Sequence, residues 1–126
     1  MKNTVYALPT ATYHLKTAQQ FKATFQHGNA VKNKYFTLIY APNQLKHPRL
    51  GFAVAKNKVK KAVMRNTVKR WVKESFRLYK QQICAVDIVF LATVKTPQLT
   101  SKDLFTALEK IWDTQLNSEK SIDLSH

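Results

Sequence analysis

The stretch GFAVAKNKVKKAVMRNTVKRWVKESFR, residues 51–77, contains the pattern that decides the fold. It opens as a short apolar strand, passes through a lysine-rich turn and continues as a long helix. From Val63 to Lys80 the positions on one side of this helix recur with the 3.6-residue period of a packed face. These positions are Met64, Val68, Trp71, Val72, Ser75, Leu78 and Tyr79. The opposite side is basic, so the sequence predicts a helix that packs by one face and presents positive charge on the other.

Two further helices are predicted, one on each side of this stretch. Thr17 and Gln20 have the spacing of a capping box for a helix over residues 18–27, and Gly28 is expected to end it in the left-handed conformation. The residues before Thr17 are expected to form a polar lead-in. A last helix begins after Thr100 or Ser101. Its inward residues are predicted to be Leu104, Leu108, Ile111 and Trp112.

Three strands complete the predicted elements, over residues 35–40, 49–55 and 86–93. The resulting order, α-β-β-α-β-α, predicts an α/β two-layer sandwich with a small sheet. We expect a single domain over residues 1–126, with its core at about 15–116 and polar tails at both ends.

The charge of the chain is unevenly distributed. The 126 residues carry a formal net charge of +14. Residues 1–73 contain 15 Lys and Arg and no Asp or Glu, whereas residues 74–126 contain 6 basic and 7 acidic residues. A merely solubilising surface usually mixes both signs. The acid-free block therefore indicates a polyanionic partner, because neutralising phosphates releases condensed counterions. Nucleic acid is favoured over membrane lipid.

The sequence offers little for protein-borne catalysis or metal binding. The four histidines lie far apart in the sequence, without the paired spacing of a metal site. All seven carboxylates lie beyond Lys73, and no set of them can be assembled into a two-metal nuclease site. The single cysteine, Cys84, suits a reducing compartment, and no apolar run is long enough for a membrane span. We therefore expect a cytoplasmic protein with no catalytic and no metal-binding residues of its own.

The central stretch resembles the signature of the bacterial ribonuclease P protein subunit. In that signature a glycine-containing strand and a lysine-rich turn precede a helix that opens with Arg-Asn-x-x-Lys-Arg. The matching residues are Arg65, Asn66, Lys69, Arg70, Glu74 and Phe76, and flanking matches are His27-Gly28, Tyr35-Phe36, His47-Pro48-Arg49, Asp87–Phe90 and Leu108–Trp112. The similarity covers roughly residues 15–116. One departure is Thr67, where relatives usually have a third basic residue.

The resemblance implies a fold, an enzyme and a division of labour. The fold is ribosomal protein S5 domain 2-like, with a left-handed β-α-β crossover, against the usual right-handed preference. The enzyme is the ribonuclease P holoenzyme, an endoribonuclease that removes the 5′ leader from precursor tRNA. Its catalytic subunit is RNA, which also holds most of the Mg²⁺, so the protein has no catalytic residues and needs no organic cofactor. Its implied partners are the catalytic RNA and the 5′ leader, with no membrane and no stable protein partner.

The resemblance also implies two sites. The first would dock on the RNA subunit and comprises Lys56, Lys58, Lys60, Lys61, Arg65, Asn66, Lys69, Arg70 and Lys73. The second is a cleft for the leader, between the first helix and the sheet, lined by Phe21, Phe25, Thr37, Ile39, Ala53 and Ala55. Aromatic faces suit a single strand because any base can stack on them. Two phenylalanines four residues apart are also typical of an ordinary core, and the sequence leaves that alternative open.

Three other functions are compatible with parts of the sequence. A ribosomal protein would share the basic block, although the Arg65–Arg70 motif and its flanking strands would then be coincidental. A stand-alone nuclease would need activity without RNA. A DNA-binding regulator is disfavoured because the helix at Val63 has no helix-turn-helix partner.

Overall fold

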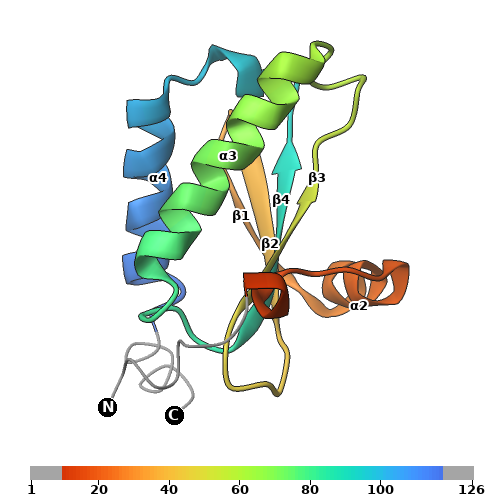
Figure 1. The fold of residues 1–126 in the computed structure, drawn as a ribbon, viewed down its shortest axis with the longest axis vertical. Coiled ribbons are helices and arrows are strands. Elements are labelled where there is room, and N and C mark those ends of the chain that lie inside the picture. Colours follow the sequence, from red (N-terminus) through yellow and green to blue (C-terminus); the bar gives the residue numbers. More distant parts are fainter. Residues whose placement is uncertain (1–9, 118–126) are drawn as a thin grey trace.

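The computed structural model, which describes residues 10–117, has a mixed α/β fold built on one four-stranded sheet (Figure 1). The strands lie in the order β1-β2-β4-β3, and only the β3-β4 pair is parallel. Helices α3 and α4 pack on one face of the sheet, and α2 lies against the other. The elements are η1 (Thr10–Tyr13), α2 (Ala18–His27), β1 (Asn29–Lys32), β2 (Phe36–Pro42), β3 (Arg49–Ala53), α3 (Ala62–Tyr79), β4 (Val86–Ala92), η2 (Thr96–Gln98) and α4 (Ser101–Thr114).

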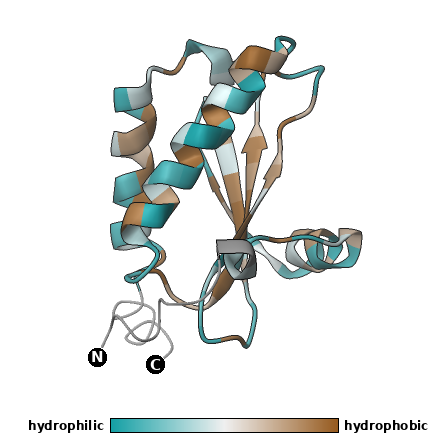
Figure 2. Ribbon diagram, in the orientation of Figure 1, coloured by the Kyte–Doolittle hydropathy of each residue, from teal (hydrophilic) through white to brown (hydrophobic). Residues whose placement is uncertain are grey.

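The hydrophobic core lies between the sheet and the helix pair α3 and α4. Alternate residues of the strands point into it, as the pleat requires, and Leu38, Ile88 and Phe90 are completely buried. Apolar colouring follows the strands and the inner sides of the helices in Figure 2. The four predicted inward residues of α4 are all buried, and Thr100 caps that helix by accepting a hydrogen bond from the Asp103 backbone N–H.

The buried face of α3 is close to the predicted one, and Leu78 is the exception. Val68 and Val72 are completely buried, but Leu78 is 55% exposed. It lies about 100° around the helix from the line through the buried valines, outside the packed stripe. Ser75 belongs to the stripe because its buried Oγ accepts a hydrogen bond of 2.9 Å from Trp112 Nε1. This bond ties α3 to α4.

The beginning of α2 is as predicted, and its end is not. Thr17 Oγ1 accepts a hydrogen bond from the Gln20 backbone N–H at 3.1 Å, and Gln20 Oε1 accepts one from the Thr17 N–H at 3.2 Å. Gly28, however, is extended with φ −89°, so the expected left-handed ending is wrong. A Cβ atom at Gly28 would lie 2.4 Å from the Thr24 carbonyl oxygen and 2.6 Å from Ile39 Cγ2. The glycine is needed for this close approach, not for its φ angle.

A fourth strand, β1, follows Gly28 and was not predicted. Its four residues pair with β2 at the edge of the sheet, and three of them are exposed, so the segment lacks an apolar pattern. The turn into β2 is held by Asn33, whose Oδ1 accepts hydrogen bonds from the backbone N–H groups of Tyr35 and Phe36. The observed ends of β2 and β3 also differ from the predicted 35–40 and 49–55.

The segment before α2 covers the other edge of the sheet. The Leu15 backbone N–H donates a hydrogen bond of 3.0 Å to the Leu50 carbonyl, and His14 forms a parallel bridge to Leu50. Tyr13 is 1% exposed and Leu15 is 7% exposed, so the expectation of a polar lead-in is wrong here. The remaining parts of the predicted tails, residues 1–9 and 118–126, lie outside the described residues.

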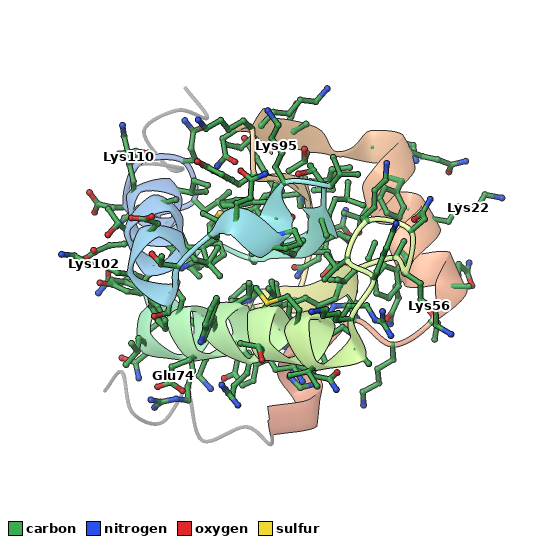
Figure 3. The ribbon with its side chains drawn as sticks, turned by 90° about the horizontal axis from the view of Figure 1, so that it is seen from above. Lys22, Lys56, Glu74, Lys95, Lys102 and Lys110 are labelled. Carbon is green, nitrogen blue, oxygen red and sulfur yellow. The ribbon has the colours of Figure 1, made fainter. Side chains whose placement is uncertain are left out.

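The crossover from β3 through α3 to β4 is left-handed. In Figure 1 the arrows of both strands point up, β3 lies to the right of β4, and α3 passes in front of the sheet. Figure 3, seen from above, places α3 on the same side. This is the rare hand for a parallel connection. With this left-handed crossover, the outer side of α3 faces the Tyr13–Leu15 segment across the edge strand β3.

Candidate nucleic-acid interface

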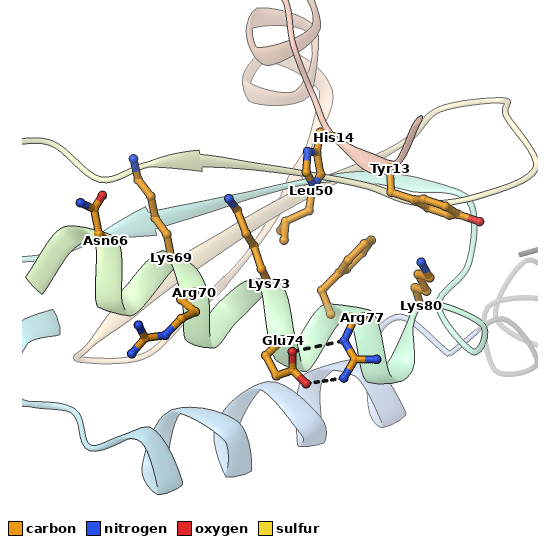
Figure 4. Close-up of a pocket in the computed structure, with 11 residues that line it drawn as sticks. Tyr13, His14, Leu50, Asn66, Lys69, Arg70, Lys73, Glu74, Arg77 and Lys80 are labelled. Atoms are coloured by element: carbon orange, nitrogen blue, oxygen red, sulfur yellow. Dashed lines mark hydrogen bonds and ion pairs between the residues drawn. The ribbon is translucent and has the colours of Figure 1, made fainter. Parts of the chain in front are cut away.

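A groove of about 530 Å³ lies between the outer side of α3 and the Tyr13–His14 segment (Figure 4). Leu50 and Phe76 contribute apolar surface to it. Four residues predicted to bind an RNA subunit come together along its α3 wall, namely Asn66, Lys69, Arg70 and Lys73. These residues belong to α3, an 18-residue helix that is anchored by a stripe of buried residues, so the positive charges are presented from a rigid support.

Aromatic rings hold two of the ammonium groups at the groove. Lys80 Nζ lies 4.1 Å from the centroid of the Tyr13 ring, and Lys73 Nζ lies 5.8 Å from that of Phe52. Both distances are within the range of cation–π attraction. These contacts orient the lysines toward the groove without neutralising them. Lys80 was not among the predicted site residues, although the helix period places it on the basic side.

His14 is a further groove residue that was not among the predicted site residues. Partial burial lowers the pKa of its imidazole below the ordinary 6.5, and the positive charges of Lys73, Lys16 and Lys80 lower it further. The ring is therefore a neutral group surrounded by cations. The alternation of Tyr13, His14 and Leu15 is the sequence signal that could have indicated an ordered edge segment.

One carboxylate, Glu74, also lines the groove, and it is paired within α3. Its side chain accepts hydrogen bonds from Arg77 in an ion pair one turn along the helix (Figure 4). That hydrogen bonding lowers the pKa of Glu74 and raises the pKa of Arg77. Arg77 is thereby partly neutralised, which leaves the three lysines and Arg70 as the uncompensated cations of the groove.

The predicted lysine turn lies beyond the groove, at the end of the molecule where α3 begins. Lys56, Lys58, Lys60 and Lys61 are all exposed there. The turn itself is ordered because the backbone N–H groups of Lys58 and Val59 both donate to the Ala55 carbonyl at 3.0 Å. Val59 anchors it in the core with 1% of its surface exposed.

Arg65 holds this turn from the first turns of α3. Its Nη1 donates hydrogen bonds to the carbonyl oxygens of Val59, at 2.8 Å, and Lys60, at 2.9 Å. Arg65 thus has a structural task within the predicted interface. Thr67, the position that departs from the family signature, donates a hydrogen bond of 2.8 Å to the Val63 carbonyl one turn back.

The second predicted site falls on the sheet face opposite the core. Strand register places Thr37, Leu91 and Ala53 in one row across three strands, and Ile39, Val89 and Gly51 in the next. The ring of Phe21, from α2, meets the Gly51 row. Phe21 is half-buried, whereas Phe25 is 43% exposed. The structure therefore brings Phe21, Thr37, Ile39 and Ala53 to one face, with Phe25 on the exposed side of α2.

One predicted cleft residue, Ala55, lies beyond the end of its strand, and two residues that were not predicted share the row of Thr37. β3 ends at Ala53, and Ala55 belongs to the following turn, so its predicted place on the strand is wrong. Leu91 and Lys32, from β4 and β1, share the row of Thr37. Alternation along each strand gives their side of the sheet, but only the pairing register places them beside Thr37 and Ala53.

An ion pair lies at the end of this face where β3 begins. Arg49 donates to Asp87 through Nε at 2.8 Å and Nη2 at 2.7 Å, and Asn43 Nδ2 donates to the same carboxylate at 3.0 Å. Donating these hydrogen bonds to the Asp87 carboxylate raises the pKa of Arg49. This explains the one acidic residue within a buried strand: its charge is fully engaged with partners on neighbouring segments.

Among residues 10–117, no three His, Cys, Asp or Glu side chains gather as a metal site would require. No helix within that same range is long and apolar enough to cross a membrane.

The fold and the surface together define a small α/β protein with a strongly basic helix face. The family model described as Ribonuclease P matches residues 10–115. The chain is 40% identical to the ribonuclease P protein component of Photobacterium profundum over 98 residues, which cover 78% of this chain and 83% of that protein. It is 35% identical to the component of Coxiella burnetii over 107 residues, which cover 85% of this chain and 88% of that protein.

Solved structures give the same result. The fold matches the RNase P protein of Staphylococcus aureus with a TM-score of 0.73 at 31% identity, covering 79% of this chain and 91% of that one. It matches the RNase P protein of Thermotoga maritima with a TM-score of 0.70 at 29% identity, covering 79% and 94%. The chain belongs to the ribonuclease P protein family. The curated relatives named above are ribonuclease P protein components.

Proposed function

We propose that this protein is the subunit that binds the catalytic RNA of ribonuclease P and assists removal of the 5′ leader from precursor tRNA. The observation that carries the proposal is the basic side of α3, where Lys69, Arg70 and Lys73 line one groove on a rigid helix. The partners of this protein are then the RNA subunit and the precursor tRNA. The protein acts in the cytoplasm, where this RNA and its substrate meet.

The groove and the lysine turn are proposed to dock on the RNA subunit. Arg70 can make forked contacts to phosphate oxygens, and Asn66 can both donate and accept hydrogen bonds. Lys58, Lys60 and Lys61 extend this surface beyond the start of α3. A polyanion crossing both regions would meet Glu74 as the single carboxylate among the residues that line the groove.

The sheet face beside α2 is proposed to hold the single-stranded leader. Phe25 exposes enough of its ring to stack on a base, and Thr37, Leu91 and Ala53 offer a row of modest side chains that a ribose-phosphate strand can approach. Lys32 lies on the adjacent strand of the same row, where it can pair with a phosphate. Because mature tRNA lacks a leader, these contacts favour the precursor.

Catalysis and Mg²⁺ binding are assigned to the RNA. Mg²⁺ in an RNA active site activates the attacking water and stabilises the developing phosphate charge. The residues of this chain bind and position RNA in this proposal, and none of them touches the reacting phosphate.

Reconstitution tests the proposed function directly. The protein, its RNA subunit and a 5′-labelled precursor tRNA are combined at low Mg²⁺, with each component alone as a control. We expect leader removal that requires the RNA and is stimulated by the protein. Cleavage at the mature 5′ end by nuclease-treated protein alone would contradict the assignment, as would a lack of stimulation by folded protein.

A further inference from the structure

A second cavity, of about 660 Å³, lies at the end of the molecule where α3 begins. It opens between the lysine turn and η2, the two segments that follow the carboxyl ends of the parallel strands β3 and β4. Figure 3 looks onto this end, where Lys56 and Lys95 are labelled. None of the residues on the sheet face proposed to hold the leader lines this cavity. Of the residues predicted to bind RNA, only Lys58, Lys60 and Lys61 line it.

The cavity combines an apolar lining with a cationic rim. Met64, Val94 and Pro97 supply apolar surface, and Val94 is 63% exposed. Lys58, Lys60 and Lys61 supply the charge, and no carboxylate belongs to the lining. Ligand pockets commonly combine an apolar lining with a few charged groups, as this cavity does.

Both walls of the cavity are fixed before any ligand arrives. On one side, Arg65 clamps the carbonyl oxygens of the lysine turn, as described above. On the other, the buried Thr96 hydroxyl donates to the Tyr35 carbonyl at 2.5 Å and accepts from the Thr93 N–H at 2.8 Å. A preformed cavity orders few groups on binding, so little of the binding free energy is lost.

We infer that this cavity binds one unpaired, unstacked nucleotide of the RNA subunit, with the base on the apolar lining and its phosphates on the lysines. A nucleotide has both a flat apolar face and flanking negative charge. A duplex would present its phosphates and leave the apolar lining uncovered, since its bases stack on one another. The inference rests on the proposed function for the source of the RNA, while the chemistry of the cavity can be tested alone.

The first test uses a mononucleotide as the probe. Methyl NMR signals of Val59, Met64 and Val94 are followed in the full chain during titration with adenosine 5′-monophosphate, and separately with ribose 5-phosphate. We expect the base-bearing probe to shift all three signals, and the base-free probe to leave them largely in place. The methyl groups of Val63, which is 78% exposed outside the cavity, serve as the internal control. Equal shifts with both probes, or larger shifts at Val63, would overturn the inference.

The second test compares two matched variants on the whole RNA subunit. Val94→Ser removes apolar surface from the cavity, and Val63→Ser makes the same change at an exposed position beside it. We expect Val94→Ser to lower the affinity for the RNA subunit about three- to tenfold and Val63→Ser to leave it unchanged. Equal affinities of the two variants would refute the nucleotide site. If leader removal still depends on the protein in that case, the proposed function stands without it. An acidic peptide that shifts the cavity signals where the mononucleotide does not would also refute the site.

Discussion

The ring of Phe21 lies directly on the backbone of Gly51. A Cβ atom added to Gly51 would be 2.6 Å from Phe21 Cζ and 2.7 Å from Cε1, closer than real side chains approach. Helix α2 is therefore docked on the sheet through a ring that fills the space left by a glycine. Phe21 therefore packs on the sheet, and Phe25 is the more exposed member of the phenylalanine pair.

Gly51→Ala should weaken the docking of α2. The added methyl group must displace the Phe21 ring, which we expect to lower the free energy of unfolding by about 1–3 kcal/mol. Urea denaturation of Gly51→Ala, Phe21→Ala and the double variant measures the effect. Because the smaller side chain at position 21 removes the clash, the double variant should lose less stability than the sum of the single losses. Simple additivity would show that the two residues do not compete for one space.

Phe25→Ala should affect RNA and not stability. The ring is 43% exposed, so we expect its removal to change the free energy of unfolding by less than about 0.5 kcal/mol. If the ring stacks on a leader base, affinity for precursor tRNA should fall by about 1–3 kcal/mol, with affinity for mature tRNA unchanged. Gln26→Ala, at the neighbouring exposed position, is the control. An unchanged ratio of precursor to mature affinity would remove Phe25 from the leader site.

Arg65→Ala should lower both the stability of the protein and its affinity for RNA, whereas Arg70→Ala should lower the affinity alone. Arg65 donates to two carbonyl oxygens of the lysine turn, so its loss should cost about 1–2 kcal/mol of stability as well as RNA affinity. Arg70 is exposed in the groove and has no hydrogen bond or ion pair within residues 10–117, so its loss should lower RNA affinity alone. Thermal melts combined with binding to the RNA subunit distinguish the two. Equal melting temperatures for both variants would show that the hydrogen bonds from Arg65 to the lysine turn do not stabilise the fold.

His14 should make the folded protein less stable in mild acid. Its pKa in the folded state is below the ordinary 6.5, chiefly because of burial and then because of three lysines, whereas the unfolded chain has the ordinary value. The unfolded state therefore binds the proton more readily. Stability is fully present above about pH 6.5 and declines as the pH falls through the lower pKa of the folded state.

Denaturant unfolding at pH 7.5, 6.5 and 5.5 checks this contribution of His14. The variant His14→Gln should lose less stability than the parent protein over this range, because it has no imidazole to protonate. His27→Gln, at an exposed position at the end of α2, should lose as much as the parent. Parallel pH curves for all three proteins would show that His14 has no such role.

Local sequence signals predicted the elements whose stability is largely local. The capping box of Thr17 and Gln20, the cap at Thr100 and the inward residues of α4 are all confirmed. The left-handed ending at Gly28 was wrong because that glycine is required by Ile39, a residue distant in sequence. β1 was missed because an exposed edge strand needs no apolar pattern.

The sequence by itself determined the charge separation, the amphipathic helix predicted over residues 63–80 and the family signature within it. These depend on residue type and on the 3.6-residue period, which are fixed along the chain. Only the tertiary structure decided the partners across space. It placed His14 beside Lys73, Leu91 beside Thr37 and Ala53, and Phe21 on Gly51. Such neighbours depend on strand register and on which edge of the sheet a segment covers, and these are set by the packing of the whole domain.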